Sequence, residues 1–211
     1  MKIKPYKYYL FDFDGTLFDT IESSKYVFKE AYASIGVNIK ESDVLGYTRE
    51  PIPDAYKRLN APIDKWDIFV KNITALVNSK KSCELTYIYD DTFDTVIDLK
   101  TSEAILGIVT SNNVKHVKDI LKIHHLEDIF FDVLVGNEEA PVPKPDPMPL
   151  EVALKMMKYE GDRSDILYIG DALNDLKAAK AAGIDSLLLD RENHYPDSDE
   201  YIKIHSLKEL L

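Results

Sequence analysis

The sequence predicts an α/β protein in which a mainly parallel sheet is interrupted by an inserted helical segment. Two observations predict this class: short apolar runs typical of buried strands alternate with helical patterns, and the first two runs lie too far apart for a simple crossover. The chain has 211 residues, of which 45% are hydrophobic. This length supports one substantial core, or a core with a small second domain.

The strands are expected in five short apolar runs, each bounded by polar or turn-forming residues. They comprise residues 6–13, 104–110, 131–135, 166–170 and 185–189. Helical patterns occur between or beside these runs, at residues 91–100, 113–122, 148–158 and 176–182. Because helices separate successive strands, the strands are expected to run parallel and to be covered on both faces.

The long stretch between the first two strands is expected to form a separate helical unit. It shows helical patterns near residues 20–35, 52–59 and 63–77, and no convincing strand pair. Prolines at positions 51, 53 and 62 mark helix ends. We therefore expect an α/β core formed by residues 1–18 and 88–211, and a helical cap formed by residues 19–87.

Composition narrows the possible partners and location of the protein. The net charge of −11 argues against a nucleic-acid partner, because no basic excess is available to displace counterions from phosphates. No apolar run is long enough to span a bilayer, and the first residues lack the apolar stretch of a signal peptide, so a cytoplasmic protein without a membrane partner is expected. The single cysteine, Cys83, cannot form an intramolecular disulfide or a thiol metal site.

The first polar cluster follows the first expected strand and contains two aspartates, Asp12 and Asp14, on either side of Phe13. In a strand these side chains point to the same face, and Gly15 allows the chain to turn away directly afterwards. Two carboxylates about 4 Å apart repel by roughly 4 kcal/mol at an effective dielectric of about 20, so the pair favours a shared proton or a hard divalent cation. A solvated strand end or an Asx turn uses the same residues.

Two further clusters follow later strands and suit an anionic ligand. Thr110, Ser111 and Asn112 lie between a strand and a helix, where hydroxyls and free backbone N–H groups bind anions. Helix capping by Ser111 or Asn112 is the alternative. Lys144 lies between two prolines that restrict the backbone, which suits contact with a phosphate or carboxylate; an exposed surface lysine is the alternative.

The fourth cluster repeats the pattern of the first. Asp171 follows a strand directly after Gly170, and Asp175 lies about one turn further along, so both could reach a shared cation. Capping of the following helix by one of them is the alternative. Because parallel sheets bind ligands outside the carboxyl ends of their strands, the four clusters are expected to converge on one site.

Together these residues resemble the haloacid dehalogenase (HAD-like) hydrolase superfamily, which has a Rossmann-like core. Its four motifs occur here in order, as Asp12-Phe-Asp-Gly-Thr, Thr110-Ser111-Asn112, Lys144, and Gly170-Asp171 with Asp175. The position of the insert, directly after the first motif, is similar to the helical cap of the phosphoglycolate phosphatase and β-phosphoglucomutase branch. The resemblance is weakest within the cap.

The resemblance implies a phosphoric monoester hydrolase that acts on a small phosphorylated metabolite through an aspartyl-phosphate. Asp12 would be the nucleophile, and Asp14 would protonate the leaving oxygen and then activate water. The implied cofactor is Mg2+, held by Asp12, the Asp14 backbone carbonyl and Asp171, with support from Asp175. Thr110 and Lys144 complete the implied catalytic set, with Lys144 neutralising charge on the nucleophile and the phosphate. The implied phosphate ligands are Gly15, Thr16, Thr110, Ser111, Asn112 and Lys144.

Other functions remain compatible with the sequence. A phosphomutase would use the same residues and return the phosphoryl group to a bound sugar, and a silent regulatory protein could keep the same fold. Dehalogenation is disfavoured, because that chemistry needs no metal-binding acid pair. In the cap, Arg49, Lys57 and Arg58 are the candidates for contact with an anionic or polyhydroxyl leaving group, and Arg49 ranks first. Solvated surface charge is the alternative. The solvated face of one helix is expected to carry Asp90, Asp91, Asp94 and Asp98.

Overall fold

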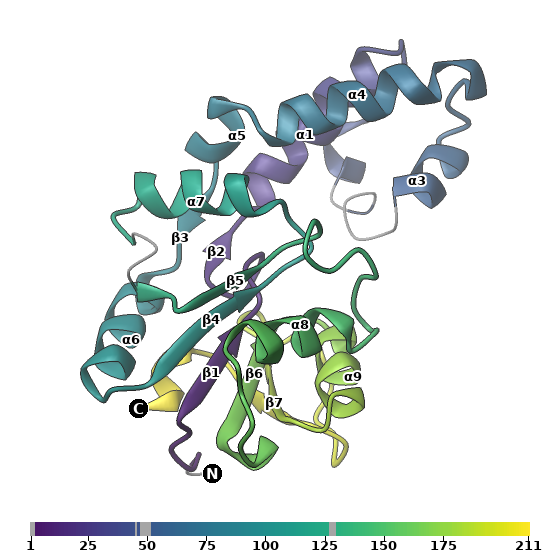
Figure 1. The fold of residues 1–211 in the computed structure, drawn as a ribbon. Helices are drawn as coiled ribbons and strands as arrows, with labels where there is room; N and C mark the ends of the chain where they lie inside the picture. The colour runs from purple at the N-terminus through teal and green to yellow at the C-terminus, as the bar shows by residue number, and fades with distance from the viewer. Residues whose placement is uncertain (1–2, 45, 47–51, 127–129) are drawn as a thin grey trace. The chain divides into compact units, whose positions relative to one another are not determined.

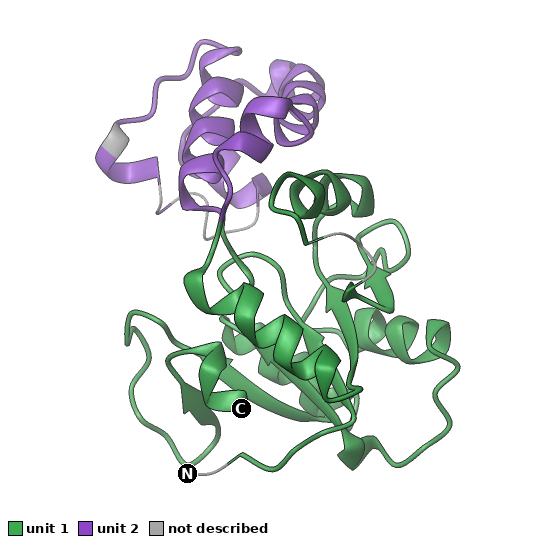
Figure 2. Ribbon diagram, turned by 90° about the vertical axis from the view of Figure 1, so that its left-hand side faces the viewer, with its two compact units in different colours: residues 1–19, 88–211 green, residues 20–87 purple. Residues whose placement is uncertain are grey.

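The computed structural model describes residues 3–44, 46, 52–126 and 130–211. The chain divides into two compact units, one formed by residues 1–19 and 88–211 and the other by residues 20–87 (Figure 2). Arg49 lies outside the described residues. In the described part of the chain, no helix is long and apolar enough to cross a membrane.

The first unit is built on a six-stranded sheet in the order β5-β4-β1-β6-β7-β8, with every neighbouring pair parallel (Figure 1). The central strand β1 pairs with β4 on one side and β6 on the other. The strands comprise β1 Tyr8–Phe11, β4 Ile105–Val109, β5 Val133–Val135, β6 Ile166–Gly170, β7 Asp185–Leu189 and β8 Ile202–Ile204. The expected α/β class with a mainly parallel sheet is confirmed.

Helices cover the sheet because each crossover between parallel strands must return along one of its faces. α8 (Met148–Met156) and α9 (Leu173–Ala181) bury alanine and leucine side chains in a core shared with β1, β4, β5 and β6. α6 (Asp90–Thr101) packs against β4 and against the short 3-10 helix η5 (Leu207–Leu210). α7 (Val114–Ile123) connects β4 to β5.

The second unit is helical and has its own aromatic core. Its elements are α1 Ile21–Ala33, η1 Glu41–Asp43, α3 Ile52–Arg58, η2 Ile63–Lys65, α4 Trp66–Val77 and α5 Lys80–Glu84. The rings of Tyr32 and Phe69 lie 4.6 Å apart between centroids, and those of Tyr56 and Trp66 lie 4.8 Å apart. Large buried rings allow a short helical insert to form a core of its own.

The structure adds elements that the sequence pattern did not predict. β8 and α5 were missed, because each is very short and lies in a stretch rich in charged and polar residues. β2 (Phe18–Asp19) and β3 (Tyr87–Ile88) pair as a two-stranded sheet, so the expectation that the long stretch between the first two expected strands contains no strand pair is wrong. α9 begins at residue 173, three residues earlier than expected.

Candidate active site

The register of the sheet brings three of the polar clusters to one edge. In the two ladders of β1, Phe11 pairs with Ile108 of β4 and with Ile169 of β6. Asp12 follows β1 directly and continues the ladder, because its backbone N–H donates to the Ile169 carbonyl at 2.8 Å. Thr110 follows β4, and Asp171 follows β6. Since the strands are parallel, these residues leave the sheet at the same edge.

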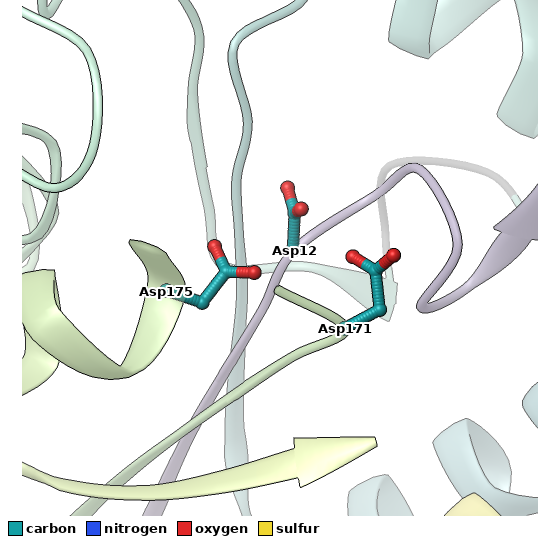
Figure 3. A group of neighbouring side chains, drawn as sticks. All are labelled: Asp12, Asp171 and Asp175. Carbon is teal, nitrogen blue, oxygen red and sulfur yellow. The ribbon is translucent and has the colours of Figure 1, made fainter. Parts of the chain in front are cut away.

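Three carboxyl groups form a compact group at this edge, which we call the carboxylate cluster: Asp12, Asp171 and Asp175. One carboxylate oxygen of each lies within 4.8 Å of the others (Figure 3). Asp12 is 9% exposed and Asp175 only 2%. Asp171 is half-buried. Three carboxylates at this spacing, two of them nearly buried, cannot all remain charged without a compensating cation.

Two glycines permit this close approach. A Cβ atom at Gly15 would lie 2.4 Å from Asp171 Oδ2, and one at Gly170 would lie 2.3 Å from Asp175 Cγ. Gly15 also has a φ of 70°, in the left-handed region that side chains disfavour. Both positions therefore require glycine because a carboxyl group of the cluster occupies the space of a side chain.

Lys144 supplies a positive charge within the cluster. Its Nζ atom lies 2.9 Å from Asp12 Oδ1 and 2.7 Å from Asp175 Oδ1, and its side chain is 8% exposed. The alternative of an exposed surface lysine is therefore wrong. A third partner is the Tyr168 hydroxyl, 2.9 Å from Nζ, so each of the three ammonium hydrogens has an acceptor.

The charges of the cluster shift the pKa of its members. Burial raises the pKa of Asp12 well above its usual range; Lys144 opposes this, and Asp175 and Asp171 add to it. Burial also raises the pKa of Asp171 to about 7, with the charges of Asp175 and Asp14 adding to the effect. Burial alone would lower the pKa of Lys144, but the charges of Asp12 and Asp175 raise it well above its usual range. One lysine thus leaves negative charge uncompensated, and hard oxygen ligands in this arrangement fit Mg2+.

Asp14 lies outside the carboxylate cluster and has a different environment. Its Oδ2 accepts a hydrogen bond from the Asn112 side-chain amide at 2.7 Å. The Asn112 backbone N–H in turn donates to Thr110 Oγ1 at 3.1 Å. The first two polar clusters are therefore joined side chain to side chain, although 98 positions separate Asp14 from Asn112.

The capping alternatives for the second and fourth clusters have different outcomes. The N-cap of α7 is Asn113, whose side chain accepts from the His116 N–H at 3.2 Å, so capping by Ser111 or Asn112 is wrong. Asp175 does contact the start of α9, because its Oδ2 accepts from the Ala172 N–H at 3.0 Å. Its other oxygen meets Lys144, so one carboxylate both holds the helix start and belongs to the cluster.

The remaining predicted phosphate ligands lie near this edge in different environments. Ser111 is exposed, whereas Thr110 is buried. Thr16 is fully buried, and within the described residues its hydroxyl has no hydrogen-bond partner. The roles of these residues in binding phosphate stay predictions.

Sequence reasoning missed Tyr168, which contacts three parts of the site. Besides Lys144, its hydroxyl lies 3.2 Å from the Val109 carbonyl and 3.2 Å from Asp175 Oδ1. Tyr168 is fully buried in the middle of β6. The available signal was one hydroxyl in an otherwise aliphatic strand, because a buried tyrosine usually finds a hydrogen-bond partner.

The fold and the site define a hydrolase of the haloacid dehalogenase-like class. The model of the family described as haloacid dehalogenase-like hydrolase matches residues 9–189. The chain therefore belongs to this family, which confirms the resemblance seen in its motifs.

Individual relatives agree with this assignment. The chain is 34% identical to a pyrophosphatase PpaX of Bacillus velezensis, over 82% of this chain and 78% of the relative. It is 27% identical to a phosphoglycolate phosphatase of Vibrio cholerae, over 86% of this chain and 83% of the relative. A HAD-superfamily hydrolase of subfamily IA from Geobacter sulfurreducens has the same fold, with a TM-score of 0.74, 20% identity and 97% coverage of both chains.

Proposed function

We propose that this protein is a Mg2+-dependent phosphatase that hydrolyses a small phosphorylated metabolite through a phosphoryl group carried on Asp12. The observation that supports it most is the pairing of Lys144 with both Asp12 and Asp175, beside Asp171, at the carboxyl edge of the sheet. Relatives named pyrophosphatase and phosphoglycolate phosphatase support the same chemistry.

The proposed metal ligands are Asp12, Asp171 and the backbone carbonyl of Asp14, with Asp175 supporting them. Bound Mg2+ supplies positive charge that neutralises phosphoryl oxygens and orients the transferred group. Together with Lys144, a cation held there would balance the three carboxylates of the cluster, so a phosphate dianion could enter a nearly neutral site.

The side chains divide the reaction between them. An Asp12 carboxylate oxygen forms a bond to phosphorus while the bond from phosphorus to the leaving oxygen breaks, and Asp14 gives its proton to that oxygen. Asp14, now a carboxylate, takes a proton from water as the water oxygen attacks phosphorus. This breaks the bond to Asp12 and releases inorganic phosphate. The proton on Asp14 is thereby restored.

Neighbouring groups hold the reacting side chains in place. Lys144 holds Asp12 through a charge-assisted hydrogen bond, and Asn112 orients Asp14. Because Asn113 caps α7, Ser111 is not used as the helix cap. The Thr110 N–H is used in the sheet, where it donates to the Val135 carbonyl at 3.0 Å, so the Thr110 hydroxyl and the Ser111 amide are the proposed contacts for phosphoryl oxygens. Positioning and electrostatics of this kind account for most of the catalysis in phosphoryl transfer.

The helical unit of residues 20–87 is proposed to act as a cap that selects the substrate. Arg49 remains the proposed cap contact for an anionic or polyhydroxyl leaving group. The named relatives differ in substrate, one being called a pyrophosphatase and another a phosphoglycolate phosphatase, so both compounds belong in the first assay.

The test is a phosphate-release assay over a panel containing pyrophosphate, phosphoglycolate and sugar phosphates, with Mg2+ present. We expect release from at least one compound, loss of release with a chelator, and loss in Asp12→Asn. Asp119→Asn is the matched control, because Asp119 is a half-exposed partner of Lys115 on α7. Release that survives both the chelator and Asp12→Asn would contradict the proposal, and an isomerised sugar phosphate as product would indicate a phosphomutase.

A further inference from the structure

A second buried ion pair lies in the same unit as the carboxylate cluster. Arg191, just after β7, donates from Nη1 to Asp91 Oδ2 and from Nη2 to Asp91 Oδ1, both at 2.9 Å. The side chains are 17% and 9% exposed. The guanidinium carbon also lies 3.9 Å from the ring centroid of Tyr89. This bidentate, stacked geometry is specific to arginine.

Asp91 is therefore not part of a solvated helix face, and that expectation is wrong for this residue. Its Oδ2 also accepts from the Ser206 hydroxyl at 2.7 Å and the Leu207 N–H at 2.8 Å. Burial alone would raise the pKa of Asp91, but the hydrogen bonds from Arg191, Ser206 and Leu207 lower it. The first turn of α6 is thus held against the C-terminal segment by one carboxylate.

The same guanidinium reaches the loop that follows the nucleophile. Its Nη2 donates to the Thr16 carbonyl at 2.9 Å. The next carbonyl, of Leu17, accepts from the Thr92 hydroxyl at 2.8 Å and the Tyr89 N–H at 3.3 Å. Two consecutive carbonyls of this loop are therefore held by Arg191 and by the start of α6.

This loop, residues 14–18, has little freedom to move without disturbing the site. It closes on itself, since the Gly15 N–H donates to the Phe18 carbonyl at 2.8 Å. Gly15 lies directly against Asp171, and Asp14 meets Asn112 at 2.7 Å. A shift of the Thr16 carbonyl would move Gly15 relative to Asp171 and Asp14 relative to Asn112.

We propose that Arg191 is a positioning residue for Asp14. Anchored on both carboxylate oxygens of Asp91, it holds the Thr16 carbonyl and thereby keeps loop 14–18 in the geometry in which Asp14 reaches the leaving oxygen. This inference rests on the proposed function, in which Asp14 is the general acid. The guanidinium of Arg191 thereby links its own segment to Asp91 and to Thr16, which lie far from it in the sequence.

The experiment compares two substrates that differ in their need for a proton. The leaving oxygen of para-nitrophenyl phosphate needs little protonation, whereas that of phosphoglycolate, an alkyl ester, needs much more. In Arg191→Met we expect kcat/KM for phosphoglycolate to fall about tenfold more than kcat/KM for the aryl ester, because small displacements of a catalytic group cost roughly this much or more. The comparison uses kcat/KM because this constant reports the step in which the leaving group departs, whereas the later attack of water is common to both substrates. Asp14→Asn should give the largest difference between the losses of kcat/KM on the two substrates, and the other variants are compared with it.

Four variants separate positioning from general loss of structure, with thermal unfolding recorded for each. Asp91→Asn should reproduce the substrate-dependent loss, and combining it with Arg191→Met should add little. Arg191→Lys should fall between wild type and Arg191→Met, because lysine cannot bridge both partners. The matched control is Arg163→Met, which removes another bidentate arginine, paired with Glu151 and placed before the amino end of β6. This variant should leave the ratio of the two kcat/KM values unchanged.

The outcomes distinguish this inference from the proposed function. A wild-type enzyme that releases phosphate from both substrates, with an unchanged ratio of the two kcat/KM values in Arg191→Lys and Asp91→Asn, would overturn the role of Arg191 alone. These two conservative variants decide the question if Arg191→Met does not fold. A wild-type protein inactive on both esters and on the rest of the panel would overturn the proposed function and this inference with it.

Discussion

Tyr168→Phe is the most informative perturbation of the site, because it removes one hydroxyl and leaves the ring in place. The hydroxyl accepts from Lys144 at 2.9 Å and lies 3.2 Å from both the Val109 carbonyl and Asp175. A buried hydrogen bond to a charged group contributes about 1.5 to 3 kcal/mol, so we expect a loss of about 2 kcal/mol. For a chain of this size this corresponds to a fall in Tm of roughly 4 to 8 °C.

The kcat of Tyr168→Phe should fall only moderately, although the lost hydroxyl contacts three groups of the site. Lys144 keeps its ion pairs with Asp12 and Asp175, so its charge stays in the site while its position becomes less defined. We expect kcat on para-nitrophenyl phosphate to fall by about tenfold, equivalent to about 1.4 kcal/mol in the activation barrier. The assays are steady-state phosphate release and thermal unfolding followed by circular dichroism.

The control is Tyr9→Phe. Tyr9 is also buried on the central sheet, but its hydroxyl accepts only a neutral backbone N–H, that of Tyr6 at 3.0 Å, among the contacts described. This variant should lose about 1 kcal/mol and keep its kcat. Equal changes in both Tm and kcat for Tyr168→Phe and Tyr9→Phe would contradict a special role of the Tyr168 hydroxyl beside Lys144.

Three further predictions concern the metal, the loop and the pH dependence. Mg2+ at about a hundred times its Kd should stabilise the fold by roughly 2.7 kcal/mol, which is measured as a higher Tm. Asp171→Asn should abolish most of this rise in Tm. An equal rise in that variant would exclude Asp171 as a metal ligand. Gly15→Ala should lower kcat by at least about tenfold, because the added Cβ would lie 2.4 Å from Asp171 Oδ2 and the residue has a φ of 70°. The control is Gly183→Ala, where φ is 69° but no atom lies nearer than 3.9 Å to the added Cβ. This variant should lose stability and keep its kcat. Because the folded pKa of Asp91 is lowered, its stabilising contribution is present above the ordinary carboxyl pKa of about 3.9 and is lost as the pH falls through the folded value. Asp91→Asn should therefore reduce the difference between the urea midpoints at neutral and acidic pH, and an unchanged difference would contradict the burial and pairing of Asp91.

The sequence predicted the parts of the molecule that follow from local patterns. The central strands are continuous apolar runs, and three of the polar clusters stand directly after one of them, so the parallel order brings Asp12, Thr110 and Asp171 to one edge without further information. Lys144 was identified by its flanking prolines. Its buried contacts with Asp12 and Asp175 required the structure.

What the sequence could not predict depends on contacts between distant segments. Asp91 resembles its exposed neighbours in the helix pattern, and only the approach of Arg191 and Leu207, 100 and 116 positions away, buries it. In the sequence, Tyr168 is indistinguishable from other large residues of buried strands. Only the structure shows that its hydroxyl contacts Lys144. The three-residue strand β8 gives too short a pattern for a period of two to be recognised.

In the proposed mechanism, Asp12 carries the phosphoryl group during turnover. The direct measurement is to mix the Mg2+-loaded enzyme with a radiolabelled aryl phosphate, quench with acid, and map the label by peptide mass spectrometry. We predict a hydroxylamine-sensitive label on the peptide containing Asp12 in wild type, greater accumulation in Asp14→Asn because water is no longer activated, and none in Asp12→Asn. An active wild-type enzyme that carries no acid-stable label even in Asp14→Asn, or carries it on another residue, would contradict the account.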